Sequence, residues 1–220
     1  MPNIAVFIEQ RDGAVKKVAW QMISEARRIT AAAGGEVWGV CVGAGADAAA
    51  AEAGKYGAAK VFTADGPEFA QYGSEVYGTA LANFVNAQNP DMLMVGSTAM
   101  GKDLGPKVAA KIGCACISDA VGVTYEGGWE VRRPVYAGKC FVDVTPNTDK
   151  CVVGIRPNAF VMEESAAAGT VENFDAETGA VEAKAVVQKV EAGAGGRVEL
   201  TEAETIVSGG RGIKGPENYE

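Results

Sequence analysis

Short apolar runs alternate with amphipathic stretches along the first half of the chain. The run from Asn3 to Glu9 is rich in β-branched and aromatic residues, and apolar residues recur at helical spacing from Val15 to Ala33. Gly34-Gly35 then stops the helix, and Glu36 to Val42 is an apolar run typical of a strand covered on both faces. This order predicts a strand, a helix and a second, parallel strand.

The alternation continues as far as Ile112. It predicts, in turn, a helix over 46–56, a strand over 60–63, a helix over 74–88, a strand over 92–96 and a helix over 102–112. Strands that alternate with helices build a parallel sheet with right-handed crossovers. We therefore predict a three-layer α/β/α fold around a mostly parallel, Rossmann-like sheet.

Beyond Cys114 the pattern changes to short strand-like runs separated by turn signals. The predicted strands cover Val121 to Tyr125, Trp129 to Val135, Lys139 to Val144 and Cys151 to Ile155. Because the connections are short, we expect these strands to be antiparallel and to extend one edge of the sheet.

The last part of the chain is rich in Ala, Gly and Glu. One strand-like stretch runs from Ala183 to Val190, and a Gly/Ala-rich segment follows it. Another strand then leads from Glu204 into a glycine turn that ends at Gly212. A length of 220 residues corresponds to about one and a half domains. We expect an α/β domain over 1–190, a linker over 191–203 and the start of a second, truncated domain over 204–220.

Composition narrows the possible functions. The chain has 20 Lys and Arg against 28 Asp and Glu, a net charge of −8, which argues against nucleic acid or anionic membranes as partners. It has no histidine, which removes histidine-based hydrolase triads and most zinc sites. No apolar stretch reaches the roughly 18 residues that span a bilayer. We expect no membrane insertion, no metal and no catalytic residues.

The five cysteines are scattered through apolar runs without CxxC spacing, at Cys41, Cys114, Cys116, Cys140 and Cys151. This usage favours a reducing, cytoplasmic location. Cys114 and Cys116 alternate as strand residues do, so we expect them to pack in or near the sheet rather than to react.

Gly96 to Asp103 follows a predicted strand, opens a helix and nearly matches the phosphate loop GxxxxGK[ST]. Asp103 stands where that loop needs a Ser or Thr hydroxyl for Mg²⁺. One interpretation is an adenine-nucleotide-binding or hydrolysing domain that uses Lys102. The other is a plain loop in which Ser97 or Thr98 caps the helix and Asp103 stabilises its start.

Two further segments carry candidate chemistry. In Ser208-Gly209-Gly210-Arg211-Gly212 the glycines let a ligand approach the backbone, and amides and a guanidinium can face phosphate oxygens; such segments are also often mere turns. Arg132 to Lys139 gathers basic residues around an aromatic, with Arg156-Pro157 on a neighbouring strand. This second segment favours a partner-facing surface, and the alternative is a charged strand edge that resists aggregation.

Taken together, three segments resemble the alpha subunits of electron-transfer flavoproteins, over essentially the whole chain. They are Gly96 to Leu104 running into Ala109 to Ile112, then Arg133 to Lys139 with Arg156 to Phe160, and finally Val207 to Tyr219. The last segment is the most specific of the three.

The resemblance implies an N-terminal domain of adenine-nucleotide-hydrolase-like fold and a doubly wound FAD domain that begins at the Ser208 turn. It implies that Arg211 contacts FAD and that Ser208, Gly209, Gly210 and Gly212 shape the turn around it. It also implies an electron carrier rather than an enzyme, with a beta subunit, acyl-CoA or other dehydrogenases and a quinone oxidoreductase as partners. We expect FAD in the complete subunit but not its retention by this chain alone, because one strand and turn cannot enclose a dinucleotide.

Overall fold

The computed structural model describes residues 1–11, 13–165, 169–179, 181–190, 200–203 and 205–219. The chain divides into two units, Met1–Val190 and Glu191–Glu220. The predicted linker over 191–203 lies mostly outside the described residues. The first unit contains all the regular helices and strands, and the second contains only short 3-10 turns in its described part.

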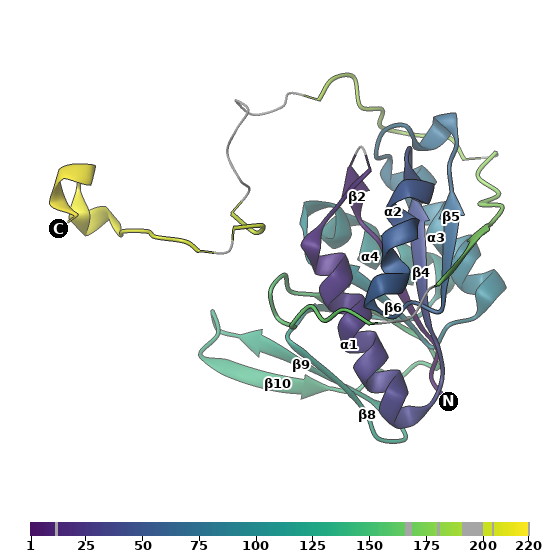
Figure 1. Cartoon of the computed structure of the whole chain (residues 1–220), viewed down its shortest axis with the longest axis horizontal. Helices are drawn as coiled ribbons and strands as arrows, with labels where there is room; N and C mark the ends of the chain where they lie inside the picture. The colour runs from purple at the N-terminus through teal and green to yellow at the C-terminus, as the bar shows by residue number, and fades with distance from the viewer. Residues whose placement is uncertain (12, 166–168, 180, 191–199, 204, 220) are drawn as a thin grey trace. The chain divides into compact units, whose positions relative to one another are not determined.

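Seven parallel strands form the central sheet in the order β12-β5-β4-β1-β6-β11-β7 (Figure 1). Their bounds are β1 Ile4–Phe7, β4 Val37–Val42, β5 Lys60–Ala64, β6 Met92–Gly96, β7 Ala115–Ala120, β11 Cys151–Ile155 and β12 Thr170–Asn173. The register places Ile4 beside Val37 on one side and beside Met92 on the other. β1 is therefore an interior strand, as its uninterrupted apolar sequence predicts.

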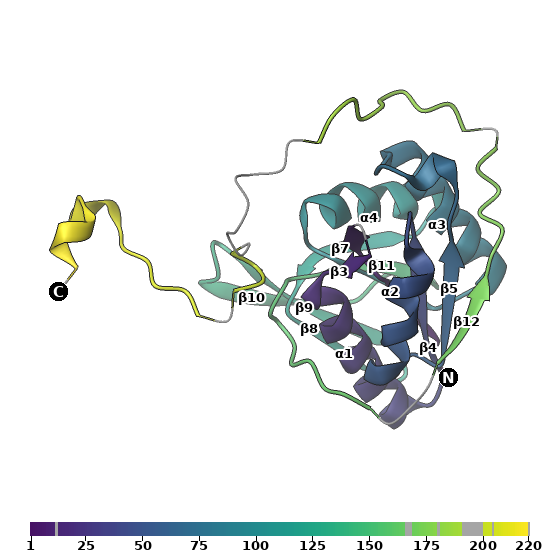
Figure 2. The ribbon, with the colours of Figure 1, turned by 45° about the horizontal axis from the view of Figure 1, so that its top comes forward.

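Two layers of helices cover this sheet (Figure 2). The helices are α1 Lys17–Ala33, α2 Ala46–Ala53, α3 Ser74–Gln88 and α4 Ala99–Ile112. Ile4 and Val6 pack with α1 and α2, whereas Ala5 and Phe7 pack with α3 and α4. Alternate residues of one strand thus serve two separate cores. The predicted three-layer α/β/α fold is confirmed.

The remaining short elements connect these layers. A two-stranded ribbon follows β1, made of β2 Gln10–Arg11 and β3 Ala14–Val15. The 3-10 turns are η1 Gly54–Tyr56, η2 Pro67–Phe69, η3 Arg211–Ile213 and η4 Pro216–Asn218. Gly34 ends α1 with a φ of 78°, the left-handed region that glycine adopts without strain.

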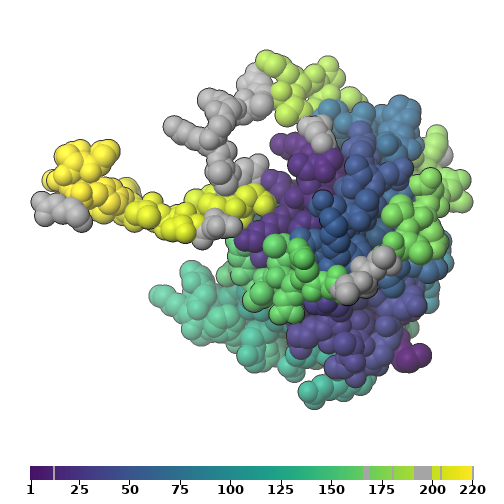
Figure 3. Space-filling view, viewed as in Figure 1, coloured from purple at the N-terminus to yellow at the C-terminus, as the bar shows by residue number. Residues whose placement is uncertain are grey.

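The antiparallel strands form a separate sheet, with β8 Gly122–Tyr125, β9 Trp129–Val135 and β10 Cys140–Val144 in the order β10-β9-β8. The expectation that they extend the main sheet was wrong. Val123 and Val131 are buried against the α1 side of the body, so this small sheet packs on the body by its face and not by its edge. Its β9–β10 hairpin projects outward (Figure 3).

The strand Cys151–Ile155 was also assigned wrongly, as antiparallel. It is β11, and it runs parallel between β6 and β7. Every residue of β11 is buried, because a strand in that position has helices or sheet on both faces. β7, which forms the edge beyond it, contains Cys116, so that residue lies in the sheet as expected, although its side chain is exposed.

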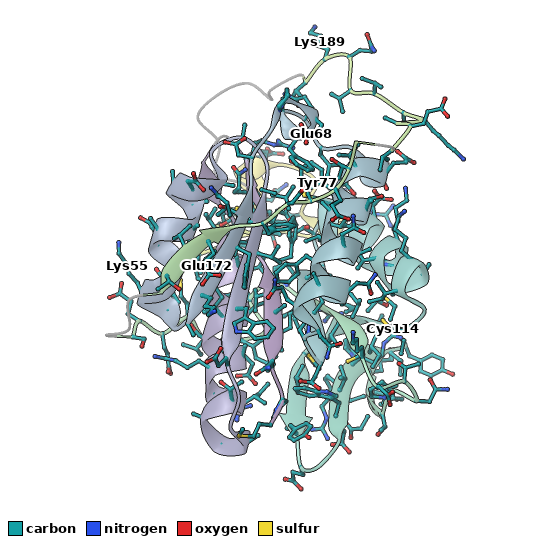
Figure 4. All side chains as sticks on the ribbon, turned by 90° about the vertical axis from the view of Figure 1, so that its right-hand side faces the viewer. Lys55, Glu68, Tyr77, Cys114, Glu172 and Lys189 are labelled. Carbon is teal, nitrogen blue, oxygen red and sulfur yellow. The ribbon has the colours of Figure 1, made fainter. Side chains whose placement is uncertain are left out.

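Two further expectations on the later chain were wrong. Residues 183–190 form no strand, and their three valines are exposed. A strand forms earlier instead, at β12, which pairs with β5 at the edge of the main sheet and contains Glu172 (Figure 4). Glu172 forms an ion pair with Lys60 of β5 at 3.3 Å. Residues 205–210 also lack regular structure, because a strand needs a hydrogen-bonded neighbour and the described part of 200–219 offers none.

Candidate functional site

In open parallel sheets, ligands bind at the carboxyl ends of the strands where the strand order reverses. Here that point lies between β1 and β6. Glu9 follows β1 and is only 6% exposed, and its carboxylate accepts a hydrogen bond from the Thr98 hydroxyl, which follows β6. The chain therefore places its own negative charge where an α/β nucleotide site needs room for phosphate.

The Gly96 to Asp103 segment does not form a phosphate loop. Only Ser97 and Thr98 separate β6 from α4, whereas a phosphate loop keeps its intervening residues outside the helix to surround the phosphates. A Cβ atom on Gly101 would lie 1.8 Å from the carbonyl oxygen of Gly96. The backbone at Gly101 therefore packs directly against the backbone at Gly96, and no space for a phosphate remains between them. The geometry supports a plain loop and removes the basis for nucleotide hydrolysis by Lys102.

Thr98 caps α4, as predicted for Ser97 or Thr98. Its Oγ1 accepts a hydrogen bond from the Gly101 amide at 3.0 Å, and α4 accordingly begins at Ala99, three residues before the predicted start at Lys102. Asp103 does not stabilise the helix start. It accepts a hydrogen bond from the Tyr72 hydroxyl, and that bond holds the pKa of the Asp103 carboxyl below its ordinary value.

The carboxyl ends of β5 and β12 form an acidic hollow of about 380 Å³. Its charged lining residues are Asp47, Asp65, Glu68, Asp175 and Glu177, and Glu68 is labelled at this end of the sheet in Figure 4. Among the described residues no group of acidic side chains or cysteines has the geometry to hold a metal ion. An acidic hollow of this kind also disfavours phosphate-bearing ligands.

The cysteines offer no activated thiol inside the fold. Burial raises the pKa of Cys41 to about 12 and that of Cys151 to about 12. Burial also raises the pKa of Cys114 and of Cys116. Because the thiolate is the nucleophile, these four residues are poor candidates for catalysis.

Basic side chains gather at the carboxyl ends of β7 and β11, in contrast to the acidic hollow at β5 and β12. Asp119 and Arg156 form a two-fold hydrogen-bonded ion pair at 2.9 and 2.6 Å. This pair, with nearby Lys102 and Arg133, lowers the pKa of the Asp119 carboxyl. Three cations thus surround one carboxylate, and the sequence expectation that Arg156 and the Arg132 to Lys139 segment share one region is confirmed.

The β9–β10 hairpin presents apolar and basic groups to solvent. Tyr136 at its tip is 80% exposed, and Phe141 on β10 is 58% exposed. Arg132 is paired with Asp143 across the two strands at 2.7 Å. Arg133, in contrast, has a buried Nε without a hydrogen-bond partner among the described residues. The basic composition was visible in the sequence, but the exposure of the aromatic side chains was not.

In the second unit, the structure places Ser208, Gly209, Gly210, Arg211 and Gly212 on one exposed segment that enters η3. A hollow of about 600 Å³ is lined by this turn and by Ile213, Lys214, Gly215, Pro216 and Tyr219. Gly210 and Gly212 face open space, and a Cβ on Gly209 would meet the Tyr219 hydroxyl. The backbone of the turn is therefore accessible where a ligand would approach.

Arg211 is exposed and forms no ion pair within the described part of the chain. Asn218 closes the turn behind it, because its amide donates a hydrogen bond to the carbonyl oxygen of Ile213 at 2.7 Å. A guanidinium beside accessible backbone suits an anionic oxygen.

Together these features define a Rossmann-like α/β protein without a phosphate loop, followed by a separate glycine–arginine turn. Comparison with known proteins then identifies the family. A family model described as the electron transfer flavoprotein domain matches residues 4–178. The chain therefore belongs to the electron transfer flavoprotein family.

Its relatives include alpha subunits of that family. Electron transfer flavoprotein subunit alpha of Bacillus subtilis (strain 168) is 36% identical over 99% of this chain and 67% of the relative. The subunit of the same name from Syntrophomonas wolfei is 34% identical over 100% of this chain and 68% of the relative. Lactate dehydrogenase (NAD(+),ferredoxin) subunit LctC of Acetobacterium woodii is 31% identical over 96% of this chain and 52% of that subunit. Across the described residues, no helix is long and apolar enough to cross a membrane.

Proposed function

We propose that this chain acts as the alpha subunit of an electron transfer flavoprotein. It pairs with a beta subunit and carries electrons through FAD, from acyl-CoA or other dehydrogenases to a quinone oxidoreductase. The observation that carries the proposal is the match to the family model over residues 4–178 together with the similarity to alpha subunits over nearly the whole chain. The protein is then an electron carrier and not an enzyme, and its unactivated buried thiols are consistent with that role.

The Ser208 turn fits one wall of an FAD site. Ser208, Gly209, Gly210 and Gly212 shape an accessible backbone, and Arg211 offers a guanidinium to the pyrophosphate. When bound, FAD supplies the electron chemistry, and the protein holds and orients it. A dinucleotide also needs neighbouring strands and helix N-termini around it, which the described part of 200–219 lacks. We therefore propose that 204–220 opens an FAD-binding domain after a linker over 191–203, and that this chain alone does not retain FAD.

The β8–β9–β10 sheet offers a surface for the beta subunit. β10 pairs with β9 alone among the described strands, so one row of its backbone amides and carbonyls is open. Phe141 and Val142 lie on opposite faces of β10 and are 58% and 39% exposed. An exposed edge strand with apolar side chains is a site for strand addition by another chain. The five free cysteines, none joined in a disulfide, support a cytoplasmic setting.

The test is co-expression of the full chain with an electron transfer flavoprotein beta subunit, followed by size exclusion and a visible absorption spectrum. We expect co-elution of the two chains, whereas this chain alone stays colourless. Arg211→Ala should lower any flavin retained by the pair, and Lys184→Ala, at an exposed cation that does not line the hollow, is the matched control. Separate elution of the two chains under all conditions would refute the proposal.

A further inference from the structure

The tip of the β9–β10 hairpin has a costly backbone conformation. Tyr136, Ala137 and Gly138 have φ values of 51°, 55° and 83°. Glycine adopts this left-handed region freely, but the Cβ atoms of Tyr and Ala make it unfavourable for them. Val135 and Cys140 pair at the two ends of this four-residue loop, and loop positions of positive φ are normally filled by Gly, Asn or Asp. The chain therefore retains a turn sequence that is not the most stable one for its geometry.

Packing does not compensate for this cost. The Tyr136 side chain is 80% exposed, and Ala137 and Gly138 are exposed as well. A strained residue with an exposed aromatic side chain indicates a function outside the folded chain itself. Tyrosine is also one of the side chains that contribute most to protein–protein interfaces.

The charges near the tip indicate what Tyr136 meets. Lys139 is exposed and forms no ion pair within the described residues. Arg133, in contrast, is held by its own chain, because its guanidinium donates a hydrogen bond to the Ser118 hydroxyl and lies near Asp119. Arg132 is held as well, since Asp143 already satisfies it through two hydrogen bonds. One cation, Lys139, thus remains available beside an exposed aromatic ring on a protein of net charge −8. It complements a carboxylate on a partner.

We propose that the strained tip is a preformed docking anchor, in which Tyr136 enters an apolar pocket of the beta subunit and Lys139 meets a carboxylate at the rim of that pocket. This inference rests on the proposed function, because it names a contact within the same subunit pair. The open edge of β10 lies on the same hairpin, so strand addition and the tyrosine anchor would act on one partner. The turn is already formed in the free chain and its backbone exposes the ring before contact, so docking need not order this segment.

The experiment compares variants of the full chain by their affinity for the beta subunit and by their melting temperature. We expect Tyr136→Ala to weaken binding about ten-fold or more, and Tyr136→Phe to stay within about three-fold. Val161→Ala is the matched control, because Val161 is a 75% exposed apolar residue elsewhere, and it should leave affinity unchanged. None of these variants should lower the melting temperature.

A second variant separates docking from folding. Replacing Tyr136 and Ala137 together by Asn and Gly relieves the strain, so we expect a higher melting temperature with the same loss of affinity as Tyr136→Ala. Wild-type affinity in both Tyr136→Ala and the Asn-Gly variant, while the wild-type chain binds the beta subunit, would overturn this inference and leave the proposed function intact. Failure of the wild-type chain to bind at all would instead overturn the proposed function, and this inference with it.

Discussion

β1 and β10 are both short strands with apolar residues, yet their surroundings are opposite. The residues of β1 are at most 1% exposed, and β1 has a parallel neighbour on each side. Phe141 on β10 is 58% exposed, and β10 has one neighbour among the described strands. Similar side chains stabilise the fold in the first strand and are available to another molecule in the second.

This difference separates stability from recognition along one chain. Substitutions in the parallel sheet should change the free energy of unfolding and reach the partner only indirectly. Substitutions in the hairpin should change the affinity for the partner with little effect on unfolding. The predictions below test this separation.

The largest expected effect contrasts two phenylalanines. Phe7→Ala removes a ring that is 1% exposed and packed between the sheet and its α3–α4 layer, and we expect a loss of about 3–5 kcal/mol in unfolding free energy. Phe141→Ala should change that free energy by no more than about 0.5 kcal/mol. Urea unfolding measures both. Equal losses for the two variants would break the separation.

Next in size is the closed loop after β6. Gly101→Ala forces a methyl group against the Gly96 carbonyl, 1.8 Å from an ideal Cβ, and we expect a loss of about 1–3 kcal/mol. Gly128→Ala, on the β8–β9 turn, meets nothing within 4 Å and serves as the control. Thermal unfolding of the two variants decides this prediction. A Gly101→Ala chain as stable as wild type would contradict the tight packing of α4 on β6.

A smaller effect is expected at the cap of α4. Thr98→Ala removes the oxygen that accepts from the Gly101 amide and the hydroxyl that donates to Glu9, and this should cost about 1–2 kcal/mol. Thr145→Ala, at an exposed threonine beyond β10, should be close to neutral. Urea midpoints compare them, and a neutral Thr98→Ala would argue against the cap.

The smallest effect concerns pH. Arg156 lowers the pKa of Asp119 below its ordinary 3.8, so the stabilisation is fully present above pH 3.8 and is lost as the pH falls through the lowered folded-state value. The Asp119 side chain is 34% exposed, which limits the effect to about 1 kcal/mol or less. Asp119→Asn tolerates the same left-handed backbone, and it should lose less stability below pH 4 than the wild type. If the stability of Asp119→Asn fell with pH as steeply as that of the wild type, the result would contradict a stabilising ion pair.

The sequence predicted the parallel α/β core well because its signal is local. Strands such as β6 and helices such as α3 have clear apolar periodicity, and their bounds, Met92–Gly96 and Ser74–Gln88, match the prediction. The direction of β11 was predicted wrongly and β12 was not predicted, because both depend on pairing with strands far away in the sequence. Exposed Thr170–Asn173 has no strand pattern of its own and becomes a strand through its pairing with β5.

The candidate sites show the same contrast between features that are local in sequence and features that depend on the folded structure. The Ser208 turn was identifiable because its glycines and Arg211 are adjacent in sequence, although their contact with FAD stays a prediction. The charge at Glu9 was not identified, because its partner Thr98 is 89 residues away along the chain. The strained tip at Tyr136 was also invisible, since Tyr-Ala carries no signal for positive φ.

The most direct test of the account compares two edge strands, β10 of the small sheet and β12 of the main sheet. Hydrogen–deuterium exchange of the full chain, measured with and without the beta subunit, reports on the backbone amides of β10 and of β12. We predict slower exchange over 136–144 in the complex and unchanged exchange over Thr170–Asn173 of β12. Slower exchange at β12 with no change over 136–144 would contradict the assignment of the β9–β10 hairpin as the recognition surface.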